Sequence, residues 1–106
     1  MEGAYSFFAE PGEFEATSFG KYPLAFDFSA WIDESDLPPS NPTARLIRQP
    51  EKTAYPDGVL SIGLDGTTVV VNVGSLEPKH DYYLIVSVTL SPVKVPTAVI
   101  LIRVPM

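Results

Sequence analysis

The stretch from Val59 to Val88 constrains the fold more than any other part of the chain. Two alternating apolar runs, residues 59–64 and 67–73, are joined by Asp65-Gly66. Asp-Gly between such runs is typical of a β-hairpin with a type I′ turn, because both central residues of that turn need positive φ angles. The stretch therefore predicts an antiparallel pair of strands.

A tyrosine corner follows this hairpin in the sequence. Leu76, Pro78 and Tyr82 lead into an alternating strand over residues 82–89. In Greek-key sandwiches a tyrosine at this place is buried at the sheet corner, and its hydroxyl bonds to backbone a few residues upstream. We therefore expect Tyr82 to pin one sheet over the other.

The remaining strand patterns complete an all-β domain. Residues 24–32, 43–48 and 97–104 alternate between apolar and other side chains, and no helical period is present. We expect Trp31 and Ile32 to turn inward where the first of these strands ends. We expect no regular element through Pro42 or the prolines before it. The pattern predicts an immunoglobulin-like or fibronectin-like Greek-key β-sandwich of about seven strands over residues 24–106.

Composition narrows the classes of function. The chain has 106 residues, no cysteine and a net charge of −6. That length suits one domain, and the absence of cysteine excludes disulfides and thiolate chemistry. The acidic balance argues against nucleic acid as a partner, because phosphate binding needs clustered Lys and Arg. With no signal-like segment and no apolar run of about 20 residues, we expect a soluble protein made in the cytoplasm, with no membrane partner.

Residues 1–23 differ from the rest and form an expected N-terminal arm. Aromatic residues alternate irregularly there with Gly and Glu, and neither a helical nor a strand period holds. One interpretation is a strand and loop folded back on the chain's own sandwich. The other is an arm whose aromatic side chains dock on a neighbouring subunit. The candidate contact residues are Phe7, Phe8, Phe14 and Phe19.

A second group of candidate contact residues lies on the last two strands. Tyr83 and Ile85, and likewise Val99 and Leu101, occupy the face opposite the expected core. A solvated outer face would carry polar residues at such positions. If the two strands pair, the outer face presents a contiguous apolar patch, which indicates either a partner or a covering segment of the chain.

Catalytic and metal-binding patterns are weak. His80 beside Asp81 lacks a nucleophile signature. Asp33, Glu34 and Asp36 lack the spacing of a calcium loop, and an ordinary solvated acidic loop is the favoured interpretation. We therefore expect a protein that is not an enzyme and has no cofactor and no metal.

Two segments resemble small immunoglobulin-like bacteriophage structural proteins. They are residues 26–32, which read Phe-Asp-Phe-Ser-Ala-Trp-Ile, and residues 65–89, with the hairpin and the Tyr-Tyr-Leu-Ile-Val-Ser-Val-Thr strand. The resemblance spans residues 24–104. Such proteins are described as head fibre, capsid decoration or cement proteins. The departures from their pattern are the N-terminal segment and the proline-rich loop at residues 37–42.

The resemblance implies a virion protein without enzymatic activity, most of all a capsid decoration or cement protein. Its expected partners are the major capsid protein, copies of itself in a trimer or dimer, or both. The alternatives are another virion component of the neck, tail or fibre, and a fibronectin-like carbohydrate-binding or adhesion module. In the latter, Tyr22, Trp31 and Tyr55 would stack on sugar rings.

Overall fold

The computed structural model describes residues 5–8, 12–17 and 20–105, with side chains from Glu13 onward. Within these residues the only helices are two single 3₁₀ turns, and the rest of the regular structure is β. The elements in chain order are β1 (Tyr5–Phe8), β2 (Gly12–Glu15), β3 (Lys21–Asp27), η1 (Ser29–Trp31), β4 (Ser40–Gln49), β5 (Thr53–Ala54), η2 (Pro56–Gly58), β6 (Val59–Asp65), β7 (Thr68–Gly74), β8 (His80–Thr89) and β9 (Thr97–Val104).

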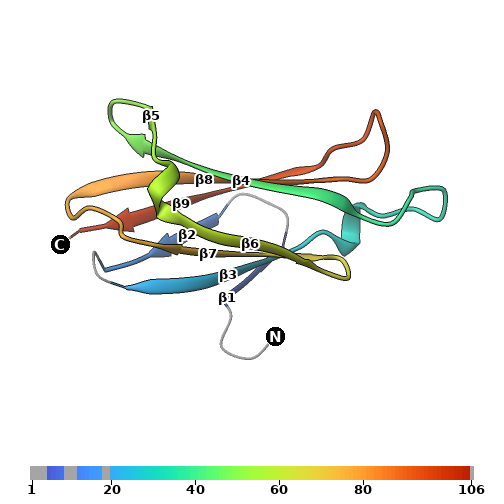
Figure 1. The fold of residues 1–106 in the computed structure, drawn as a ribbon, viewed down its shortest axis with the longest axis horizontal. Helices are drawn as coiled ribbons and strands as arrows, with labels where there is room; N and C mark the ends of the chain where they lie inside the picture. Colours follow the sequence, from blue (N-terminus) through green and yellow to red (C-terminus); the bar gives the residue numbers. More distant parts are fainter. Residues whose placement is uncertain (1–4, 9–11, 18–19, 106) are drawn as a thin grey trace.

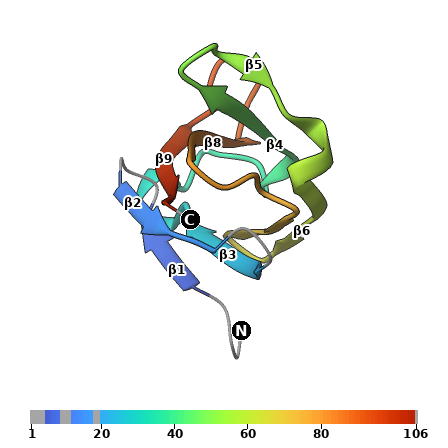
Figure 2. The ribbon, with the colours of Figure 1, turned by 90° about the vertical axis from the view of Figure 1, so that its left-hand side faces the viewer.

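The strands form two sheets, which confirms the predicted all-β class and a sandwich-like arrangement. One sheet has the order β1-β3-β7-β6 and the other has the order β2-β9-β8-β4-β5. Figure 1 shows them as two layers, and Figure 2 shows both sheets from the end of the molecule. The β1–β3 and β2–β9 pairs are parallel, whereas the other pairs are antiparallel.

The core lies between the two sheets and follows the alternation of the strands. On β8 and β9 every second side chain is buried, and β3 and β7 supply the opposing layer. Because strand side chains alternate between faces, one run of alternating residues serves one face of a sheet. The largest fully buried side chains include Phe26, Phe28, Leu84, Leu90 and Tyr82.

The tyrosine corner is present as predicted. Tyr82 has no exposed surface, and its hydroxyl accepts a hydrogen bond of 2.9 Å from the Glu77 backbone N–H, five residues upstream. Burial raises the pKa of the Tyr82 hydroxyl. The bond satisfies a polar group that would otherwise be buried without a partner.

The β6–β7 hairpin is present, but its predicted turn type is wrong. Asp65 pairs with Thr68, so Gly66 and Thr67 form the two-residue loop. Gly66 alone in this loop has a positive φ, of 62°. A positive φ at the first central position is the pattern of a type II′ turn, which requires glycine there. The sequence pattern placed Asp65 inside the turn, whereas in the structure Asp65 is the last paired residue of β6.

The strand predicted over residues 24–32 ends earlier than expected. The Ser29 backbone N–H donates a 2.9 Å hydrogen bond to Asp27 Oδ1, and the Trp31 N–H donates one to the Phe28 carbonyl. These local bonds replace the β ladder with a 3₁₀ turn. Ile32 packs partly against the core, but Trp31 is 45% exposed, so its predicted inward orientation is wrong.

The proline-rich loop is also shorter than expected, because β4 begins at Ser40 and runs through Pro42. The register with β8 shifts there, since Ser40 pairs with Thr89 whereas Thr43 pairs with Ser87. At such a bulge the extra residue needs no ladder hydrogen bond, so a residue without an N–H is tolerated.

The N-terminal segment contributes two short strands to the sheets of its own chain. β1 pairs with β3 at the edge of the four-stranded sheet, and β2 pairs with β9 at the edge of the five-stranded sheet. The expected boundary between residues 23 and 24 falls within β3. With β1, β2 and the two-residue β5, the described residues contain more strands than the predicted seven.

Candidate functional site

The outer face of the five-stranded sheet carries the strongest candidate site. β8 and β9 pair with Tyr83 opposite Leu101 and with Ile85 opposite Val99. Directly opposed residues in an antiparallel pair lie on the same face, about 5 Å apart. The four residues predicted from sequence therefore form two adjacent rows, and Tyr83 is 41% exposed.

Ile47 of β4 extends this group. It pairs with Tyr83 on the side of β8 away from β9, and it is partly exposed. The alternation over residues 43–48 puts Ile47 on the face opposite Ala44 and Leu46, but no pattern in the sequence shows that β4 lies beside β8. We refer to these apolar side chains as the outer patch: Ile47, Tyr83, Ile85, Val99 and Leu101.

Polar rows bound the outer patch at both ends of the strands. At one end Thr43 Oγ1 and Ser87 Oγ are hydrogen-bonded to each other. The sides carry charge, with Glu13 opposite Leu101 and Arg45 opposite Ile85. An apolar centre with a polar margin is the arrangement of a protein–protein contact surface. The bounding rows are Thr43, Ser87 and Thr97 at one end and Gln49, Asp81 and Arg103 at the other.

The N-terminal strands do not lie over the outer patch. β2 continues the same sheet beside β9, and β1 belongs to the other sheet. The covering segment that the sequence left open is thus not formed by these two strands, and Tyr83 in the patch is 41% exposed.

The aromatic residues predicted as arm contacts are divided by the structure. Phe14 is level with Ile102 on the core side of β2, packs against the core and lies 5.1 Å from the Tyr22 ring in an edge-on arrangement. Phe7 and Phe8 belong to β1, but their side chains fall outside the described residues, as does Phe19 entirely. Phe14, the one of the four whose side chain the structure describes, does not join the outer patch.

A group of side chains fixes the end of the sandwich near the tyrosine corner. The Tyr55 hydroxyl donates a 2.6 Å hydrogen bond to the Ser75 carbonyl, and its ring lies 5.2 Å from that of Tyr82. The Arg48 guanidinium sits over the Tyr55 ring and pairs with Glu77. These contacts hold the inner side of the sheet that carries the outer patch.

His80 has a structural contact. Its Nδ1 lies 3.2 Å from the Gln49 carbonyl oxygen, to which a protonated Nδ1 donates. The ring thus links the start of β8 to the end of β4.

The acidic loop is held by a lysine from the β8–β9 connection. Lys94 Nζ lies 2.8 Å from Asp36 Oδ2 and 3.3 Å from Asp33 Oδ2. The Asp33 backbone N–H and Lys94 hold the pKa of the Asp36 carboxyl below its usual range, and the same carboxyl raises the pKa of Lys94. Asp33 and Asp36, two of the three carboxylates considered for a cation, are thus paired with Lys94. Across the described part of the chain there is no cluster of three or more metal-ligating side chains.

The three aromatic residues considered for sugar binding do not share a surface. Tyr22 lies near the start of β3, whereas Trp31 follows the end of that strand. The Tyr22 hydroxyl bonds to Thr17, and Tyr55 belongs to the group around Tyr82. Trp31 therefore lies at the other end of β3 from Tyr22 and does not form one stacking platform with it.

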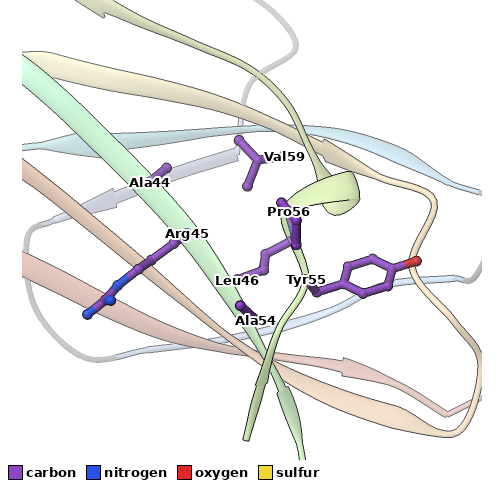
Figure 3. A pocket seen from close by; sticks show the side chains of 7 residues that line it. All are labelled: Ala44, Arg45, Leu46, Ala54, Tyr55, Pro56 and Val59. Atoms are coloured by element: carbon purple, nitrogen blue, oxygen red, sulfur yellow. The ribbon is translucent and has the colours of Figure 1, made fainter.

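A pocket of about 350 Å³ opens between β4 and the segment that follows β5. Figure 3 shows Leu46, Pro56 and Val59 around it, whereas Arg45 leaves β4 in the direction away from Leu46. The lining is almost entirely aliphatic and aromatic, so it offers few polar groups to orient a ligand. Its residues are Ala44, Arg45, Leu46, Ala54, Tyr55, Pro56 and Val59.

Comparisons with known proteins gave no identification. No protein-family model matches the chain, and a search of curated proteins gave no match either. Among the described residues, no helix has the length and apolar character that a membrane span requires.

Proposed function

We propose that this chain is a non-enzymatic structural protein of a bacteriophage virion, a capsid decoration or cement protein that stabilises the head shell through protein–protein contacts. The observation that carries the proposal is the outer patch, an apolar surface on a well-packed sheet. Tyr83 is exposed and the other four residues of the patch are partly exposed. Contiguous apolar residues of this kind with a polar margin favour a protein partner. The resemblance of residues 24–104 to small phage structural proteins supplies the virion setting.

We also propose that the sandwich is immunoglobulin-like. The orders β3-β7-β6 and β9-β8-β4-β5 match the strand orders B-E-D and G-F-C-C′ of variable-type immunoglobulin domains. The tyrosine corner at Tyr82 supports this assignment, because that motif occurs near the start of strand F. β1 lies beside β3 in the place of strand A, but it pairs parallel to β3, and β2 pairs parallel to β9.

The test of the virion role begins with purified particles of a phage whose genome encodes the chain. We expect mass spectrometry to find many copies of the chain per particle, in the head fraction. The heads of particles made without the gene should disassemble at a lower temperature than wild-type heads. Adding the wild-type protein should restore the wild-type temperature.

The matched variants for this test are Tyr83→Asp and Val93→Asp. Both place a carboxylate at an exposed apolar position, but Val93 is 94% exposed and lies outside the outer patch, in the β8–β9 connection. We expect Val93→Asp to restore head stability and Tyr83→Asp to fail. Absence of the chain from the particles would contradict the virion role, and its recovery with tails would move the role there. Full restoration by Tyr83→Asp would contradict the assignment of the patch.

A further inference from the structure

We propose that the occupant of the outer patch is a second copy of this chain, packed face to face about a twofold axis. The inference rests on the proposed function only for the role of the patch as a contact surface. The proposed neighbour is a second copy of the chain, whether or not the two copies meet inside a virion.

The charges beside the patch support a second copy over an unrelated partner. Glu13 on β2 lies level with Leu101, and Arg45 on β4 lies level with Ile85, one row further along the strands. The two opposite charges therefore stand at diagonally opposite corners of the apolar area. Arg45 has no ion-pair partner among the described residues. Glu13 pairs with Arg103, and both of these side chains are more than half exposed.

A surface with this arrangement is complementary to itself. When two copies pack face to face, a twofold axis in the contact plane can be set at right angles to the line between the two corners. Each Glu13 then faces Arg45 of the partner, and the reverse contact forms as well, as required for an isologous dimer. The same axis passes near Tyr83, so the two exposed tyrosine rings meet at the centre. Aromatic side chains at the centre of a contact commonly contribute most of its binding energy.

The area of the face sets how tightly the two copies are expected to bind. Four strands are about 19 Å wide and an eight-residue strand is about 26 Å long, which gives a face of roughly 500 Å². A standard stable interface buries about 800 Å² per partner. The face is smaller than that, so we expect a reversible dimer with a dissociation constant in roughly the micromolar range.

Sedimentation velocity of the full chain over roughly 1 to 500 μM, a range chosen around the expected constant, measures this association directly. We expect a concentration-dependent shift from monomer to dimer for the wild type and for Val93→Asp. Tyr83→Asp should raise the dissociation constant at least about tenfold, because two like charges would meet at the centre of the contact. A monomer throughout, a higher oligomer, or a dimer unaffected by Tyr83→Asp would overturn the proposal.

Charge reversal tests the twofold arrangement itself. Glu13→Arg and Arg45→Glu should each weaken the dimer about three- to tenfold, because like charges then meet at both corners. The double variant restores opposite charges and should bring the constant back to within about threefold of the wild type. A double variant as weak as or weaker than the single ones would overturn the arrangement.

These results separate the inference from the proposed function. A chain that is monomeric in solution yet present in virions overturns only the self-contact. A dimer that is absent from virions overturns only the virion role.

Discussion

Tyr82 and Tyr83 are neighbours in one strand, yet they belong to opposite faces of the sheet. Tyr82 has no exposed surface, and its hydroxyl is hydrogen-bonded to the chain's own backbone. Tyr83 is 41% exposed and sits opposite Leu101 in a second apolar layer. The inner layer is covered by the other sheet, whereas no strand of the described residues lies over the outer layer.

The difference separates two uses of apolar residues. Burial within the chain stabilises the fold directly, at about 25 cal/mol per Å² of apolar surface removed from water. On the outer face Ile47, Ile85, Val99 and Leu101 are already partly buried by their neighbours in the sheet, whereas Tyr83 keeps 41% of its surface exposed until another molecule covers it. Substitutions on the two faces should therefore change different quantities, namely the free energy of unfolding on the inner face and association on the outer face.

The largest expected contrast comes from truncating the two tyrosines. Tyr82→Ala should lower the free energy of unfolding by about 3 to 5 kcal/mol, because it leaves a large cavity in the core. Tyr83→Ala should lower it by less than about 1 kcal/mol, since most surface substitutions have small effects. Urea denaturation followed by circular dichroism, at a protein concentration low enough to keep the chain monomeric, gives both values. Equal losses would mean that the outer face is covered within the chain.

A smaller contrast isolates the hydroxyl groups. Tyr82→Phe keeps the ring but removes the acceptor for the Glu77 N–H, so we expect a loss of about 1 kcal/mol. Tyr83→Phe is the matched control and should change the free energy of unfolding by less than about 0.5 kcal/mol. If the two variants unfold at the same urea concentration, the tyrosine corner contributes nothing measurable.

The smallest expected effect is a local loss of stability at acid pH, in a loop that belongs to neither face of the sheet. The pKa of Asp36 is lowered in the folded chain by the Asp33 N–H and Lys94. Its contribution to stability is therefore present above the unfolded pKa of about 3.9 and is lost as the pH falls through the lower folded value. We expect amide exchange in the loop around Asp36 and in the β8–β9 connection to rise below about pH 4, before the inner face of β8 opens.

Asp36→Asn is the control for the acid effect. It keeps the side-chain shape but removes the titrating charge, so its loop exchange should lack that pH dependence. Simultaneous opening of the loop and of the Tyr82 region in the wild type would show that the loop is not an independent unit.

The candidate site was predictable in part. Tyr83, Ile85, Val99 and Leu101 stand out because apolar residues occupy both faces of their strands, and a hairpin pairing of those strands brings them together. Ile47 could not be added from sequence, since its neighbour across the sheet lies 36 residues further along the chain. The charged corners depend likewise on β2 and β4 flanking the β8–β9 pair.

Local sequence rules failed where a short-range bond or a neighbouring strand overrode them. Trp31 was expected to turn inward where its strand ends, because a fully exposed tryptophan is uncommon. The hydrogen bond from the Ser29 N–H to the Asp27 side chain instead begins a 3₁₀ turn, which leaves Trp31 exposed. Pro42 was expected to exclude a strand, but a bulge against β8 admitted it. Phe14 looked like a contact residue of an arm, and pairing with β9 placed it against the core instead.

The sequence by itself determined the alternation and the inward face of β8 and β9, the hairpin between β6 and β7 and the tyrosine corner. All of these depend on residues close together in the chain, where side-chain period and turn chemistry act directly. The tertiary structure decided which strands are neighbours, and with that the extent of the outer patch and the charges at its corners. Contacts between distant strands depend on how whole sheets pack, which no local pattern specifies.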